Sequence, residues 1–183
     1  MEALIVSTGL VALAEIGDKT QLLSFVLAAR LKKRIPIVLG IVFATLANHF
    51  LAGYAGAWLA QMVSAEALRW IVAISFFAFG AWALVPDTLD EGRDLRGAGV
   101  FLTTLIAFFM VEMGDKTQIA TVALAARFPE IVSVVLGTTF GMMLANTPVI
   151  FFGNQLAARI PLKFVRWTAA ACFAALAVGA ALI

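Results

Sequence analysis

Apolar runs long enough to cross a lipid bilayer recur along this chain, and they restrict the folds open to it. About 20 helical residues cross the roughly 30 Å of hydrocarbon in a bilayer. Six apolar runs approach or exceed that length, at residues 3–29, 35–62, 68–85, 99–126, 131–156 and 164–182. A spanning segment must satisfy its own backbone hydrogen bonds, and these runs are too continuous for the strands of a barrel. The sequence therefore predicts an all-α membrane protein with six transmembrane helices.

Composition leads to the same class of protein and excludes several partners. Hydrophobic residues make up 63% of the chain and charged residues 13%, whereas soluble domains are about half apolar and about a quarter charged. The basic residues are not interleaved with exposed aromatics, so membrane lipid is an expected partner and nucleic acid is not. The one cysteine, Cys172, allows neither a disulfide nor a thiolate cluster within the chain. A homo-oligomer is compatible with the pattern.

An acidic segment occurs twice, as AEIGDKTQ at residues 14–21 and as VEMGDKTQ at residues 111–118, 97 residues apart. The similarity continues beyond it, for example in LAAR at 27–30 and 124–127. Each copy contains three spans, and because three is odd the second copy enters the membrane from the opposite side, as in many secondary transporters. We therefore expect two inverted three-helix repeats, at residues 1–86 and 99–183, joined by an acidic cytoplasmic linker loop at 87–98.

Loop charges predict the orientation. Nine Lys and Arg residues lie in the first, third and fifth loops or close to them, and only Arg69 and Arg127 lie in the other two. Cytoplasmic loops carry the excess of basic residues, so both termini are expected outside. The N-terminus, MEALIVSTGL, has no basic segment before its apolar run, and we interpret it as the first span rather than as a signal peptide.

Each copy of the acidic segment places two carboxylates inside an apolar run: Glu15 and Asp18 in the first, Glu112 and Asp115 in the second. An ionisable residue within a membrane is costly and is by default a candidate functional site. A spacing of three puts the Glu and the Asp of one copy on the same face of a helix. Further oxygen atoms on or near these faces come from supporting residues, which are Gln21, Gln118, Thr20, Thr117, Ser24 and Thr121.

If the two segments meet at the repeat interface, four carboxylates converge there. A carboxylate-rich set of oxygen ligands suits a hard divalent cation such as Mn²⁺ or Ca²⁺, and the sequence does not choose between the two. Four neighbouring carboxylates in a low dielectric cannot all stay ionised, so an empty site would hold protons that a metal ion displaces. This competition predicts exchange of a divalent cation for protons.

The remaining polar residues within the runs leave several interpretations open. Lys19 and Lys116 follow the Glu of their own copy at the i, i+4 spacing that favours an ion pair. They either hold the site closed when metal is absent or serve a structural pairing. Gly17 and Gly114 either allow close helix packing, which we favour, or break the helix locally. Three further residues either line the pathway or join helices by hydrogen bonds; they are Asn48, His49 and Asn146.

The duplicated pattern E-x-G-D-K-T, at residues 15–20 and 112–117, resembles the signature of the GDT1 family of cation/proton antiporters. The resemblance covers essentially the whole chain and implies transport of Mn²⁺ and Ca²⁺, with the Glu and Asp of the pattern as ligands. It implies no permanently bound cofactor, because the metal is the transported substrate. The short loops resemble the bacterial manganese-exporter type, for which Mn²⁺ efflux across the inner membrane is implied.

Three other functions remain to be weighed. An exporter of amino acids or other small solutes, of the related lysine-exporter-like group, would use Lys19 or Lys116 to bind a substrate carboxylate. A channel would share the repeat symmetry. A membrane metalloprotease would need an HExxH motif, and the chain has a single histidine and no such motif. We therefore expect a transporter and not an enzyme.

Overall fold

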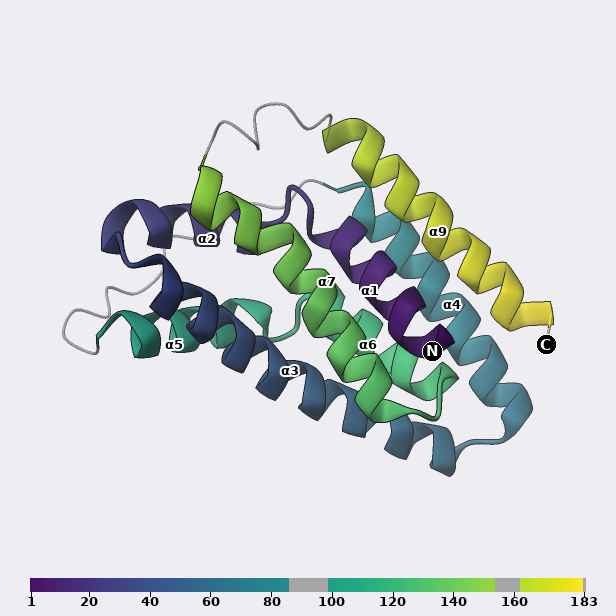
Figure 1. Ribbon diagram of the computed structural model, residues 1–183. Coiled ribbons are helices and arrows are strands. Elements are labelled where there is room, and N and C mark those ends of the chain that lie inside the picture. The colour runs from purple at the N-terminus through teal and green to yellow at the C-terminus, as the bar shows by residue number, and fades with distance from the viewer. Residues whose placement is uncertain (86–98, 154–161, 183) are drawn as a thin grey trace.

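The computed structural model of the chain describes residues 1–85, 99–153 and 162–182, and these parts consist of helices and short connections, with no strand among them (Figure 1). The predicted all-α class is confirmed. The expected linker loop at 87–98 lies outside the described residues. The helices are α1 (Glu2–Glu15), α2 (Lys19–Leu31), α3 (Arg34–Met62), α4 (Ala65–Ala83), α5 (Val100–Glu112), α6 (Lys116–Arg127), α7 (Ile131–Phe152) and α9 (Leu162–Leu182).

Four of the helices, α3, α4, α7 and α9, are long and apolar enough to cross a membrane. They correspond to four of the six expected spans. The start of α4 lies three residues before the expected run because Ser64 is its N-cap, with the hydroxyl accepting a hydrogen bond from the Ala67 N–H at 3.2 Å. Pro148 lies within α7, and the helix continues past it to Phe152.

The other two expected spans, at 3–29 and 99–126, are not single helices. Each is divided by a short break, into α1 and α2 and into α5 and α6. At the breaks Gly17 and Gly114 have φ angles of 82° and 75°, in the left-handed region that glycine adopts without steric cost. A Cβ built on Gly114 would meet nothing within 4 Å. The break, and not the helix packing that we favoured from the sequence, therefore explains this glycine.

Glycines at the helix contacts allow the long helices to approach closely. A Cβ on Gly40 of α3 would lie 2.7 Å from Thr104 Cβ of α5. A Cβ on Gly137 of α7 would lie 2.9 Å from Ser7 Cβ of α1. Gly137 follows Gly40 by 97 positions, and Thr104 follows Ser7 by 97 positions. The contact of α5 with α3 is therefore equivalent to the contact of α1 with α7.

Polar and apolar side chains are distributed in the way expected for a lipid environment. The outer surfaces of α3 and α7 expose large apolar side chains such as Phe43, Phe50 and Phe140. The interior instead holds buried polar and charged groups, and the buried carboxylates and the buried lysine of the described residues all come from the two acidic segments. Both termini and the α3–α4 connection lie towards the same end of the bundle, and the α2–α3 connection lies at the other end (Figure 1).

The close approach of α3 to α6 gives a test of the packing. A Cβ on Gly56 of α3 would lie 2.1 Å from the backbone carbonyl oxygen of Val122 in α6. We expect Gly56→Ala to lower the free energy of unfolding by about 1–3 kcal/mol, because the backbones must move apart. Thermal unfolding of the purified protein in detergent measures the effect. Gly9→Ala is the control, since its Cβ would meet nothing within 4 Å; equal melting temperatures of the two variants would contradict the packing.

Candidate metal site between the two acidic segments

The helix breaks position the four predicted carboxylates. Glu15 and Glu112 are the last residues of α1 and α5, and Asp18 and Asp115 are the N-cap residues of α2 and α6. Across each break the Asp N–H donates to the Glu carbonyl, at 3.1 Å in the first segment and 3.0 Å in the second. The expectation that Glu and Asp share one helix face is therefore wrong, because each pair spans two helices.

The glutamines hold the shape of each break. Gln21 Oε1 accepts a hydrogen bond from the Gly17 N–H at 2.9 Å, and Gln118 Oε1 accepts one from the Gly114 N–H at 2.6 Å. Each glutamine also reaches the other half of the chain. Gln21 Nε2 donates to the Ala145 carbonyl at 3.0 Å, and Gln118 Nε2 donates to Asn48 Oδ1. These residues support the site by fixing the backbone around it.

Three of the four carboxylates come together. One oxygen from each of Glu15, Glu112 and Asp115 lies within 4.8 Å of the other two, and all three side chains are buried. Thr20 Oγ1 donates to Glu15 Oε2, and Thr117 Oγ1 donates to Glu112 Oε2 at 3.1 Å. The second carboxylate oxygen of each acid is buried without a hydrogen-bond partner in the described part of the chain. Buried acceptor oxygens of this kind are hard ligands that a divalent cation can satisfy.

The lysines connect the two segments. Lys19 Nζ lies 2.8 Å from Asp115 Oδ1, and Lys116 Nζ lies 3.0 Å from Asp18 Oδ1. Each ion pair crosses from one segment to the other, a partner that the i, i+4 spacing did not indicate. Asp18 lies outside the group of three carboxylates and is held by Lys116. We refer to these two contacts as the crossed ion pairs.

The predicted pathway residues lie beside this cluster. His49 Nε2 is 3.8 Å from Glu112 Oε2, too far for a hydrogen bond, and neither ring nitrogen has a hydrogen-bond partner within the described ranges. Asn48 Nδ2 donates to the Phe109 carbonyl at a long 3.4 Å. The structure therefore places His49 and Asn48 of α3 against α5 and its terminal glutamate.

Ser24 and Thr121, the remaining candidates, form hydrogen bonds of two kinds, one between helices and one within a helix. Ser24 Oγ donates to Asn146 Oδ1 at 2.7 Å, which joins α2 to α7. Thr121 Oγ1 donates to the Thr117 carbonyl of its own helix at 2.7 Å. Of the two, Ser24 connects the halves and Thr121 does not.

Sequence reasoning missed one contributor, the backbone carbonyl of Ala145, which receives the Gln21 amide. The signal that could have found it is Pro148. A proline lacks an N–H, so it leaves the carbonyl four residues before it, at Leu144, without its helical partner and disturbs the turn there; Ala145 is the next residue of that turn.

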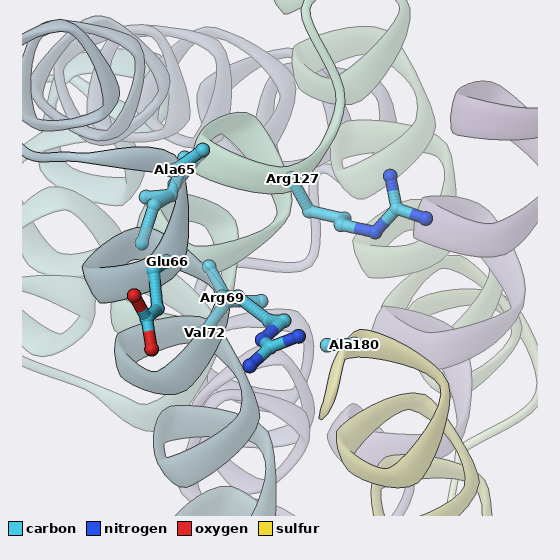
Figure 2. Close-up of a pocket in the computed structure, with 8 residues that line it drawn as sticks. Ala65, Glu66, Arg69, Val72, Arg127 and Ala180 are labelled. Carbon is cyan, nitrogen blue, oxygen red and sulfur yellow. The ribbon is translucent and has the colours of Figure 1, made fainter. Parts of the chain in front are cut away.

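A separate cleft lies where α4, α6 and α9 meet (Figure 2). Its volume is about 500 Å³, and Glu66, Arg69 and Arg127 contribute its charged groups. None of the residues of the two acidic segments lines it. The candidate metal site is therefore distinct from this cleft.

Buried acids and lysines enclosed by apolar membrane helices are typical of proteins that move ions or protons across membranes. Comparison with known proteins establishes the family. Residues 3–91 and 100–182 match the family described as "Divalent cation/proton antiporter GDT1", and the chain belongs to this family. It is an integral membrane transporter and not an enzyme.

Individual relatives agree with this assignment. A protein of Vibrio cholerae named "Putative manganese exporter" is 47% identical over 182 residues, which cover 99% of this chain and 91% of the relative. GDT1-like protein 5 of Arabidopsis thaliana is 25% identical over 198 residues, which cover 87% of this chain and 86% of the relative. GDT1-like protein 3 of Oryza sativa subsp. indica is 24% identical over 191 residues, 90% of this chain and 68% of the relative. No solved structure gave a significant match.

The burial of the crossed ion pairs predicts their contributions to stability. The side chains of Lys116 and Asp18 are 8% and 0% exposed, whereas Lys19 is 24% exposed. Removing one partner of a buried pair costs about 3–5 kcal/mol. We expect Asp18→Asn and Lys116→Met each to destabilise the protein by about this amount, and the double variant to recover much of the loss.

A double-mutant cycle from denaturant unfolding in detergent measures the coupling of each pair. The same cycle on Asp115→Asn and Lys19→Met is the matched comparison, and we expect a smaller coupling there because solvent screens the more exposed pair. A larger coupling for Lys19 and Asp115 than for Lys116 and Asp18 would contradict the prediction.

Proposed function

We propose that this protein exports Mn²⁺ from the cytoplasm in exchange for protons, through a site formed by Glu15, Asp18, Glu112 and Asp115. The observation that carries the proposal is the convergence of three buried carboxylates from both acidic segments within 4.8 Å. The fourth, Asp18, follows Glu15 by three residues and is held by Lys116. Carboxylate oxygens are ligands that Mn²⁺ and Ca²⁺ share. The 47% identity to the Vibrio cholerae protein favours Mn²⁺ over Ca²⁺.

Proton exchange follows from the ligand chemistry. A carboxyl group binds a metal ion only when it is deprotonated, so metal binding releases protons and metal release allows them to return. With the metal gone, mutual repulsion and the apolar surroundings disfavour a cluster of ionised carboxylates. Protons are therefore the natural counter-ions for the return step of the cycle, in agreement with the activity that describes the family.

We further propose that residues 1–86 and 99–183 form two inverted three-helix repeats with the site between them. Matched contacts support this arrangement. The crossed ion pairs are related by the 97-residue offset, as are the two glycine contacts that pack α5 on α3 and α1 on α7. A site at a repeat interface near the membrane midplane is the usual position in transporters of this kind.

Export of a small organic solute is the alternative, and the geometry disfavours it. Such a transporter needs a cationic group to receive the carboxylate of an amino acid. Lys19 and Lys116, the candidates for that task, are each within 3.0 Å of an aspartate oxygen. The same acids that bind the lysines are suited to a metal ion, so the structure favours a cation as substrate.

A transport assay tests the proposal. Inverted membrane vesicles or oriented proteoliposomes are loaded with an acidic lumen, and uptake of radioactive Mn²⁺ is followed together with proton efflux. We expect saturable Mn²⁺ uptake that requires the proton gradient. Glu15→Gln should lower the rate by about 100-fold or more, because even residues that merely support metal ligands cost about 10–100-fold in affinity or activity.

Glu66→Gln is the matched control, since the same chemical change occurs at an exposed residue of α4 that lines the separate cleft. Uptake of radioactive Ca²⁺ and of a labelled amino acid in parallel distinguishes the substrate classes. Undiminished Mn²⁺ flux in Glu15→Gln, or flux that ignores the proton gradient, would refute the mechanism.

The orientation has its own test. The excess of Lys and Arg in the first, third and fifth loops predicts that these loops lie in the cytoplasm and that both termini lie outside a bacterial inner membrane. We expect a C-terminal alkaline phosphatase fusion to be active and a C-terminal fluorescent-protein fusion to be dark. The reverse pattern would show that both termini lie in the cytoplasm and would contradict the proposed orientation.

A further inference from the structure

The crossed ion pairs are chemically alike and differ in their surroundings. The Lys19 side chain is 24% exposed, and the Lys116 side chain is 8% exposed. The break next to the aspartate of each pair differs in the same sense. Met113 and Gly114, which precede Asp115, are exposed, whereas Gly17, which precedes Asp18, is half-buried. One ion pair is therefore accessible from the surface of the protein, and the other is enclosed.

The two pairs also differ in their relation to the carboxylate cluster. Asp115 belongs both to the group of three acids within 4.8 Å and to the accessible ion pair with Lys19. Lys19 lies on Oδ1 of Asp115, and Oδ2 is buried without a hydrogen-bond partner among the described residues. A metal ion bound at Oδ2 would bring its two charges close to the Lys19 ammonium, and repulsion between the two cations disfavours the ion pair. Asp18 is bound by the enclosed Lys116 and lies outside the close group.

We propose that Lys19 is a tethered cation that occupies Asp115 when the substrate is absent, that a divalent ion displaces it, and that it excludes monovalent cations from the site. The proposal rests on the metal site described under the proposed function. Lys116 stays on Asp18 during this exchange, so the metal ion binds the three acids of the close group and Asp18 borders the site.

The charge of the competing ions explains the selectivity. At the same distance a divalent ion attracts each carboxylate twice as strongly as an ammonium group does, and it can bind three carboxylates at once. Na⁺ and K⁺ carry the same single charge as the ammonium group. The lysine is also covalently attached, which gives it an effective concentration of about millimolar or higher. A free monovalent ion therefore gains little by displacing Lys19, and a divalent ion gains much.

Burial explains why Lys19 is the group that moves. The Lys19 side chain is partly exposed, so its ammonium group is solvated at lower cost when it releases Asp115. Lys116 is enclosed, and an unpaired buried ammonium group is strongly unfavourable. The Lys19–Asp115 pair therefore opens at lower cost, and it is also the pair whose carboxylate belongs to the group of three acids.

Equilibrium binding of Mn²⁺ to the purified full chain in detergent, measured by titration calorimetry or dialysis, tests the proposal. We expect Lys19→Gln to bind Mn²⁺ about fivefold more tightly than the wild type, which corresponds to removal of a partly exposed ion pair. Replacing choline by K⁺ at constant ionic strength should weaken Mn²⁺ binding in Lys19→Gln severalfold and leave the wild type unchanged. Lys19→Arg should restore wild-type affinity and insensitivity to K⁺, because it retains the tethered charge.

Lys116→Gln is the matched control at the equivalent position. It removes the same charge from the neighbourhood of the cluster, so it measures the long-range electrostatic gain alone. We expect a smaller gain in affinity, no sensitivity to K⁺ and a lower melting temperature. An equal or larger gain in Lys116→Gln, or unchanged or weaker binding in Lys19→Gln, would overturn the proposal.

Two measurements keep the outcomes distinct. Glu15→Gln should lose Mn²⁺ binding; if it binds Mn²⁺ as well as the wild type does, the metal site itself is wrong. Loss of binding in Glu15→Gln without tighter binding in Lys19→Gln refutes only the tethered-cation proposal.

The wild-type protein offers a readout that needs no lysine variant to fold. Amine-selective acylation at fixed pH, quantified by mass spectrometry, should label Lys19 faster when Mn²⁺ is bound, because the displaced side chain is released from Asp115. Lys116 should remain slow, and the exposed Lys32 and Lys33 serve as internal standards. Mn²⁺-dependent protection of Lys19, or an unchanged rate, would contradict its displacement.

Discussion

The crossed ion pairs are the interaction on which the rest of the structure depends. Carboxylates buried among apolar helices are strongly unfavourable unless a cation compensates them. Asp18 finds its lysine in the second acidic segment, and Asp115 finds its lysine in the first. These contacts tie the burial of the acids to the association of the two parts of the chain. The requirement for charge compensation thus favours the packing that creates the candidate site.

The helix breaks allow this pairing. A continuous helix would place Glu15 and Asp18 on one helix surface, whereas the break at Gly17 makes the aspartate the N-cap of a new helix. The N-terminus of a helix carries a partial positive charge, which favours a carboxylate there. Gln21 satisfies the Gly17 N–H that the break leaves without a helical partner. The sequence G-D-K-T-Q therefore encodes a helix break, a cap and a cross-link in five consecutive residues.

The sequence predicted some of these features and not others, for physical reasons. Length and apolar composition were sufficient to locate α3 to within one residue at each end, because both quantities are properties of the segment itself. The acidic residues were identified because their cost in hydrocarbon is independent of the fold. The break at Gly114 was not predicted as such, because apolar residues flank the acidic segment and a glycine is compatible with a packed helix. The partner of Lys19 was missed because spacing rules describe a single helix, and this contact is tertiary.

The unequal exposure of two equivalent lysines has a consequence for the transport cycle. If the repeats are inverted, as proposed, Lys19 and Lys116 approach the cluster from opposite faces of the membrane. Exchanging the conformations of the two repeats would then enclose Lys19 and expose Lys116, which gives a state open to the other side with the same set of contacts. Two states built from interchangeable contacts differ little in free energy, and a small differential affinity for metal or protons is enough to move the population between them. On the proposed mechanism, the duplication of the acidic segment therefore supplies both the ligands and the near-equality of states that alternating access requires.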